Sequence, residues 1–184
     1  MPVYDVPHAT YDEFKNAVIG HGYNMDGAYG YQCWDGVDLL YDQVGMVFLT
    51  GIQGYASEAW TNAISREANG QFPFSIVNGI QNIKRGDIVM LAANPPAVGT
   101  AGHCAFADSN YNGTNRLVLL GQNQGSGANP TTGTVFNLTE FNISSFLGIF
   151  RYTPWNSPTP PTGSSKKKHF PWAIAFEHWG YGKI

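Results

Sequence analysis

Two residues, Cys33 and His103, could together supply a nucleophile and its base. Cys33 begins an apolar helical pattern, and a helix N-terminus favours the thiolate form of a cysteine. His103 follows Gly102 at the start of a short segment whose alternation is typical of a strand. Residues this far apart in the chain meet only through the fold. We therefore expect a helix and a strand to bring Cys33 and His103 together as a thiolate–imidazolium pair.

A third residue is expected to orient the imidazole of His103. If residues alternate regularly along the next strand, Asn123 lies at its end, on the face that approaches His103. The amide oxygen of Asn123 would then accept the imidazole N–H and fix its tautomer. Asp108 is the alternative orienting residue, although its position along the histidine strand places it on the face opposite His103.

The neighbours of the pair in the sequence also carry predictions. Gln32 directly precedes Cys33, and we expect its side chain to line the oxyanion site together with the backbone N–H of Cys33. Cys104 follows His103, so in a strand it faces the opposite side. A disulfide between Cys33 and Cys104 is therefore not expected, and Cys33 is predicted to be a free nucleophile.

The loop before the cysteine has the spacing of a calcium site. Its oxygen donors occupy positions 1, 3, 5, 7 and 12 of a twelve-residue loop and are Asn24, Asp26, Ala28, Gly30 and Asp35. This is the ligand spacing of an EF-hand, with backbone carbonyls assumed at positions 5 and 7. The loop differs from an EF-hand in Tyr29, which stands where that motif has glycine, and in the aspartate at position 12. An ordinary turn is the competing interpretation, because Asn, Asp and Gly also gather in turns.

The order of the predicted elements indicates an α+β domain. Thr10 and Glu13 form a capping-box pattern at the start of the first helix. Helices are predicted at residues 11–19, from residue 33 onward and at 56–68. Strands are predicted at 87–92, 103–108, 116–122, 134–138 and 147–152, separated by Gly and Asn clusters. This order predicts N-terminal helices packed on an antiparallel β-sheet.

Composition divides the chain into three parts. Residues 1–153 form one predicted catalytic domain, with twelve Asp and Glu against six Lys and Arg. A linker rich in Pro, Ser and Lys is predicted at 154–168, and a short aromatic segment at 169–184. The domain has no basic stripe, so nucleic-acid binding is not expected. No apolar run reaches the roughly 18 residues of a membrane span, so membrane insertion is not expected.

Four motifs occur in a fixed order along residues 10–153. They are the segments Asp26–Asp35 and Arg85–Val89, the pair Gly102-His103 and the triplet Gly121–Asn123. Together they resemble the CHAP domains of bacteriophage endolysins. The resemblance implies a papain-like fold that cleaves amide bonds of peptidoglycan, as an N-acetylmuramoyl-L-alanine amidase or an endopeptidase. It also implies Cys33 as nucleophile, His103 as base and Ca²⁺ in the loop before the cysteine.

The chain differs from this family at two positions. Asn24 stands where the family often has aspartate, which removes one charge from the calcium loop. Gly121 stands where many members have glutamate, two residues before Asn123. The orienting residue of His103 is therefore Asn123 or another group.

The resemblance also implies a partner and a place of action. Bacterial peptidoglycan is the expected partner. The lysines and aromatic residues of the C-terminal segment could contact anionic wall polymers, pack back on the domain or mediate an oligomer contact. No signal-peptide pattern opens the sequence. We therefore expect a phage-encoded protein that is made in the host cytoplasm and reaches the wall through a holin or a virion.

Two other functions remain open from the sequence. One is an NlpC-type cysteine peptidase of the same papain-like class. The other is a non-catalytic wall-binding protein that retains the fold, which Gly121 favours and the intact Cys33 and His103 oppose.

Overall fold

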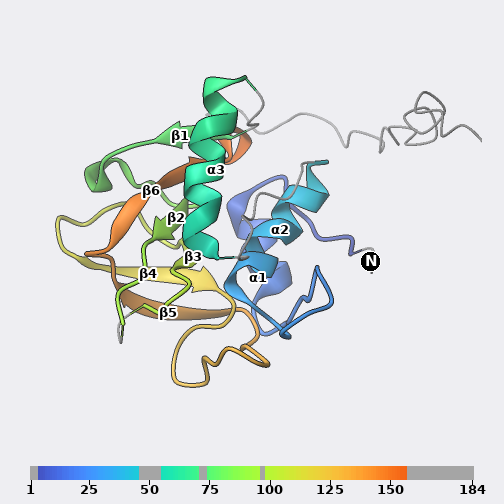
Figure 1. Cartoon of the computed structure of the whole chain (residues 1–184). Coiled ribbons are helices and arrows are strands. Elements are labelled where there is room, and N and C mark those ends of the chain that lie inside the picture. Colours follow the sequence, from blue (N-terminus) through green and yellow to red (C-terminus); the bar gives the residue numbers. More distant parts are fainter. Residues whose placement is uncertain (1–3, 46–54, 71–73, 96–97, 157–184) are drawn as a thin grey trace, which may run out of the picture.

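A computed structural model describes residues 4–45, 55–70, 74–95 and 98–156 of the chain. Three α-helices lie on one side of a six-stranded antiparallel sheet (Figure 1). The helices are α1 (Tyr11–Val18), α2 (Cys33–Gln43) and α3 (Ala56–Ala68). The strands are β1 (Ser75–Val77), β2 (Ile88–Leu91), β3 (His103–Ala107), β4 (Arg116–Gly121), β5 (Asn137–Asn142) and β6 (Phe146–Arg151). Short 3₁₀ turns, η1 (Ile80–Asn82) and η2 (Thr153–Asn156), complete the described elements.

The helices begin at local signals in the sequence. Thr10 and Glu13 form the expected capping box of α1, in which each side chain accepts a hydrogen bond from the other's backbone N–H, at 3.2 and 3.1 Å. At the start of α2, a carboxylate oxygen of Asp35 accepts the backbone N–H of Gln32 at 2.9 Å. This contact fixes the point at which the loop ends and the helix begins, and therefore the position of Cys33.

The sheet order is β1-β6-β2-β3-β4-β5, and every neighbouring pair is antiparallel. Strands β2 to β5 form the predicted meander. Strand β6, however, pairs with β2 and not with β5. Residues 143–145 alone connect β5 to β6, although β2, β3 and β4 lie between them in the sheet. The sheet is therefore strongly curved, which brings the ends of distant strands close together.

Two buried clusters hold these layers together. One lies between the helices and the sheet and includes Phe14, Tyr41, Phe106 and Phe150, each at most 1% exposed. The other covers the opposite face of the sheet, with Val89, Leu91, Leu119 and Ile149 fully buried. Burial of apolar side chains on both faces explains why β2 and β3 are apolar at nearly every position.

The structure confirms the predicted α+β architecture, with differences in three elements. Strand β5 covers Asn137–Asn142, so the prediction at 134–138 was misplaced along the chain. Strand β1 was not predicted, because its three residues carry little pattern. The domain also extends beyond residue 153. Trp155 packs on Tyr11 and Phe106 at centroid distances of 5.5 and 5.9 Å, and its indole N–H donates to His8 O at 2.8 Å.

The other sequence predictions about the C-terminal part lie outside the described residues. These are the remainder of the linker at 157–168 and the aromatic segment at 169–184. Within the described residues, none of the helices is both long and apolar enough to traverse a lipid bilayer.

Candidate active site

The structure brings Cys33 and His103 together, as the sequence predicts. Cys33 is the first residue of α2 and is partly exposed, whereas His103 is the first residue of β3 and is 5% exposed. The pKa of Cys33 lies well below its usual range. The side-chain interaction with Cys104 lowers it most, and the hydrogen bond and charge of His103 lower it further, whereas burial opposes these effects. The arrangement therefore favours a thiolate at Cys33.

The pKa of His103 is shifted in the opposite direction. Burial alone would lower the pKa of His103, but the hydrogen bond and charge of Cys33, with a contact to Gln124, outweigh burial and raise it. A lowered thiol pKa beside a raised imidazole pKa describes an ion pair of thiolate and imidazolium. Both cysteines are free in the structure, as expected.

Cys104 lies next to the nucleophile, which the alternation of the strand did not predict. Burial raises the pKa of Cys104 well above its usual value, and the side-chain interaction with Cys33 and the charge of Cys33 raise it further. Cys104 is fully buried among residues that face the helices. Because Cys33 lies at the end of β3, it reaches both His103 and Cys104 although these two alternate along the strand. Cys104 therefore remains a thiol that can donate a hydrogen bond.

Gln124 occupies the position expected for Asn123. The Nε2 atom of His103 lies 3.1 Å from Oε1 of Gln124. The imidazole also stacks on Phe141 of β5, with ring centroids 4.7 Å apart and planes inclined by 12°. Strand β4 ends at Gly121 and Asn123 has a left-handed φ of 50°, so regular alternation stops before Asn123. The prediction that Asn123 contacts His103 was wrong for this reason.

Asn123 and Gln32 bind to each other. The Asn123 amide donates to Oε1 of Gln32 at 2.6 Å, and its oxygen accepts the backbone N–H of Asn129 at 2.8 Å. The Gln32 amide donates to the carbonyl of Tyr29, so this side chain is directed back to the loop before the nucleophile. The contacts of both residues thus hold that loop.

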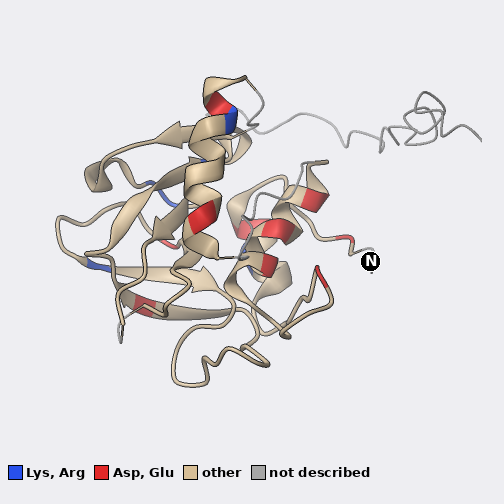
Figure 2. Ribbon diagram, viewed as in Figure 1, with Lys and Arg blue, Asp and Glu red and all other residues tan. Residues whose placement is uncertain are grey.

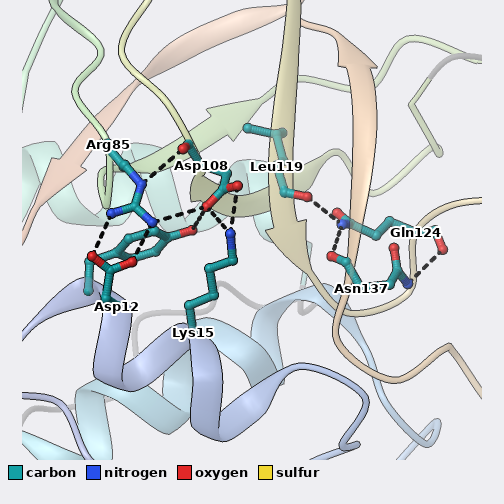
Figure 3. A network of polar contacts seen from close by, with 8 residues as sticks. Asp12, Lys15, Arg85, Asp108, Leu119, Gln124 and Asn137 are labelled. Carbon is teal, nitrogen blue, oxygen red and sulfur yellow. Dashed lines mark hydrogen bonds and ion pairs between the residues drawn. The ribbon is translucent and has the colours of Figure 1, made fainter.

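Asp108, the alternative orienting residue, belongs to a separate network. It accepts hydrogen bonds from Lys15 Nζ at 2.7 and 2.8 Å and from the Tyr11 hydroxyl at 3.1 Å, and it lies 3.6 Å from Arg85 (Figure 3). Asp12 completes the network through Arg85 at 2.6 Å. These contacts join α1 to the far end of β3, away from His103, and so exclude Asp108 as its orienting group.

The segment that presents Cys33 is anchored at both ends. Asp35 accepts the backbone N–H of Met25 at 2.7 Å as well as that of Gln32. Gln122, which is fully buried, accepts from Tyr23 N at 2.7 Å and donates to Tyr23 O at 2.9 Å and to Gln32 O at 3.1 Å. Gln122 and Gln124 lie just beyond the end of β4, and sequence analysis missed both roles.

Four of the predicted calcium donors lie in this anchored loop, and the fifth, Asp35, is the third residue of α2. Asn24 and Asp26 each accept one backbone N–H, from Gly27 and Ala28, both at 2.8 Å, and each oxygen retains a second lone pair. Burial raises the pKa of Asp35 to about 6. Hydrogen bonds from backbone N–H groups partly offset this rise, and the charge of Asp26 adds to it. Among the described residues, no group of three or more His, Cys, Asp or Glu side chains is placed to hold a metal. The amide of Asn24 and backbone carbonyls would have to complete such a site.

Comparisons with known proteins agree with this fold. No family model matches the chain. The chain is 33% identical over 167 residues to the "D-alanyl-L-alanine endopeptidase" of Streptococcus phage B30, an alignment that covers 88% of this chain and 35% of the relative. It thus spans about a third of the length of that curated relative. The crystal structure of the wild-type endolysin LysIME-EF1 superposes with a TM-score of 0.53 at 23% identity, covering 75% of this chain and 60% of that one.

The fold is therefore the α+β fold of an endolysin. The sequence relative and the structural neighbour together confirm that the chain resembles phage endolysins.

Proposed function

We propose that this chain is a cysteine-dependent peptidoglycan hydrolase of the CHAP type, which cleaves amide bonds of the bacterial cell wall. The observation that carries this proposal is the contact of a partly exposed cysteine at a helix start with a buried histidine, in which each shifts the pKa of the other toward the ion pair. The phage endopeptidase to which the chain is 33% identical supports peptidoglycan as the substrate.

The mechanism follows from the atoms at the site. The Cys33 thiolate attacks the carbonyl carbon of the amide, and the backbone N–H groups at the start of α2 stabilise the oxyanion. Because Nε2 of His103 is bound to Gln124, Nδ1 is the nitrogen that faces the thiolate and protonates the leaving amine. Water then attacks the acyl-enzyme, and Nδ1 takes its proton as the Cys33 sulfur leaves.

The bond cleaved is proposed to lie within the peptide and not between sugar and peptide. The name of the phage B30 relative describes an endopeptidase, which favours this choice over an amidase. Mass spectrometry of solubilised wall fragments distinguishes the two. An endopeptidase leaves peptide on the muramic acid residues, whereas an amidase releases the whole stem and leaves bare glycan.

The proposal is tested by turbidity loss of Gram-positive cell walls. Cys33→Ala and His103→Ala are expected to reduce the initial rate by on the order of 10³-fold, because the nucleophile and its base act as a unit. Circular dichroism of each variant provides the control for folding. Lysis by Cys33→Ala at the wild-type rate would exclude cysteine catalysis.

We also propose that the loop from Asn24 to Asp35 binds Ca²⁺ as a structural ion. The side chains of Asn24, Asp26 and Asp35 and the carbonyls of Ala28 and Gly30 would hold it. The donors are all oxygen, as this cation requires. Figure 2 shows acidic residues along α2 and in the loop before it, with no basic residue on the helix. A cation there would reduce the repulsion among these carboxylates.

We also propose where the protein acts. A phage-encoded protein of this class would act on the host wall after release by a holin or from a virion. Residues 169–184 are proposed to contact anionic wall polymers, which wall pull-down with and without these residues would test.

A further inference from the structure

Gln124 has only one way to orient its side-chain amide. Its Nε2 donates to the carbonyl of Leu119 and to the carbonyl of Asn137, both at 2.8 Å (Figure 3). Backbone carbonyls only accept hydrogen bonds, so both amide protons are directed at them and Oε1 must face His103. The residue is 2% exposed, and its backbone N–H donates to Thr134 Oγ1 at 3.1 Å. Backbone carbonyls of β4 and β5 therefore fix the orientation of the Gln124 amide.

This orientation determines the protonation of the histidine. Because Oε1 of Gln124 can only accept, the nitrogen of His103 that it contacts must carry a proton. The other nitrogen, Nδ1, is left to exchange a proton with Cys33. The stacked ring of Phe141 restricts the plane of the imidazole at the same time. Ring orientation is thus fixed before a substrate arrives, and the neutral ring that forms when Nδ1 gives up its proton is the Nε2–H tautomer.

Gly121 supplies the space that this arrangement needs. A Cβ atom at position 121 would lie 2.9 Å from Oε1 of Gln124 and 2.8 Å from Cβ of Ala105. Both distances are shorter than ordinary contacts between such atoms, so a side chain at 121 would displace the amide or the strand. The glycine and the glutamine therefore depend on each other.

We propose that Gln124 is the positioning residue of His103, and that Gly121 is required to admit it. The inference rests on the proposed function for its role in the reaction. The orienting group is then a neutral amide, which selects the Nε2–H tautomer by hydrogen bonding and adds no charge beside the imidazolium. Gln124 acts through His103 and does not contact the substrate.

The test measures alkylation of Cys33 by iodoacetamide as a function of pH, followed by intact mass, and so needs no peptidoglycan. The imidazole nitrogen shifts of His103, measured by NMR at a pH where the ring is neutral, give its tautomer. Gln124→Met removes the acceptor and the donors. We expect its alkylation profile to move by about one unit to higher pH, as for a thiol pKa about one unit higher, with loss of the pure Nε2–H tautomer. Alkylation of Cys33→Ala gives the background from Cys104.

A second variant separates positioning from stability. Gln124→Glu keeps an acceptor for His103 but loses the donors to the two carbonyls. We expect both variants to lower the melting temperature, and only Gln124→Met to change the tautomer, because the carboxylate still accepts from Nε2 of His103. Gln122→Met is the matched control, since it removes an equally buried glutamine that bonds only backbone groups. It is expected to lower the melting temperature and leave the His103 tautomer unchanged.

The outcomes separate this inference from the proposed function. A wild-type tautomer and alkylation profile in Gln124→Met would overturn the inference. An equal change of the tautomer in Gln124→Met and Gln124→Glu would also overturn it, because that change would follow stability alone. If the expected pattern appears while the wild-type protein lyses no walls, the inference holds and the proposed function fails.

Discussion

The amide of Asn123 donates to the side-chain oxygen of Gln32 at 2.6 Å, so the turn after β4 and the residue before the nucleophile are directly joined. The sequence predicts Asn123 as the orienting group of His103 and Gln32 as part of the oxyanion site. Their contact instead holds the loop that presents Cys33. Gln122 and the backbone hydrogen bond from Tyr31 N to Thr132 O, at 2.9 Å, are further ties of this loop to the residues that follow β4.

Asn123→Ala is therefore expected to weaken activity without changing how His103 titrates. It removes the bonds to Gln32 and to Asn129, which are worth about 1 kcal/mol each. We expect wall lysis to fall about two- to tenfold, with the alkaline limb of the pH–rate profile in its wild-type position. A shift of that limb by one pH unit would instead assign Asn123 to the imidazole.

Cys104 is expected to determine the pH at which activity falls on the acid side of the pH–rate profile, called the acid limb below. The side-chain interaction with Cys104 is the largest cause of the lowered Cys33 pKa. Cys104→Ala removes the donor, so the thiol pKa rises and the acid limb moves to higher pH. Cys104→Ser retains a donor and is expected to keep the limb near its wild-type position. The prediction fails if the alanine and serine variants share one profile.

Asp38 on α2 makes stability depend on pH. Burial, and the charges of Asp35, Asp42 and Asp26, raise the pKa of Asp38 to about 7. An unfolded chain releases this proton near pH 4, so the folded form loses stability as the pH rises from about 4 to about 7. Asp38→Asn is expected to add on the order of 1 kcal/mol, or about 2–4 °C in Tm, at pH 8 and little at pH 4.

The matched control for this prediction is Asp42→Asn. Asp42 lies on the same helix but is exposed. A gain in Tm that is equal for both variants, or equal at pH 4 and pH 8, would contradict burial of Asp38 as the cause.

The motif Arg85–Val89 has a structural role that Asp87→Asn tests. Asp87 is fully buried and accepts from Arg151 at 2.7 and 2.8 Å and from Lys84 N at 2.7 Å. Asparagine would leave the Arg151 charge without its partner, so we expect a loss of about 3 kcal/mol in urea unfolding. The exposed pair of Arg116 and Glu140 is the control, and Arg116→Gln is expected to cost less than about 1 kcal/mol.

Calcium is expected to raise the Tm of the protein. Ligand binding to the folded state alone stabilises it by about 2.7 kcal/mol at a hundredfold excess over Kd. Melting with Ca²⁺ and with chelator measures this directly, and Asp26→Ala is expected to abolish the difference. An unchanged Tm over millimolar Ca²⁺ would leave the loop as an ordinary turn stabilised by Asp35.

The sequence predicted the parts of the site that depend on local signals. The capping box at Thr10, the start of α2 at Cys33 and the strand at His103 are short-range patterns, and the structure has all three. It did not predict Gln124. The left-handed residue Asn123 interrupts the alternation, and the direction of the Gln124 amide depends on carbonyls of two other positions in the sheet. The curvature that brings Phe141 to His103 depends on the pairing of β6 with β2, which no local pattern specifies.

The packing of Trp155 determines where this domain can be cut for transfer to another protein. Its ring contacts α1 at Tyr11 and Phe14, and its indole bonds the carbonyl of His8, so it joins the end of the sheet to the N-terminal segment. A chimaera that joined another domain directly after Thr153 would remove this ring and open the apolar layer beneath α1. A junction placed after Asn156 keeps it.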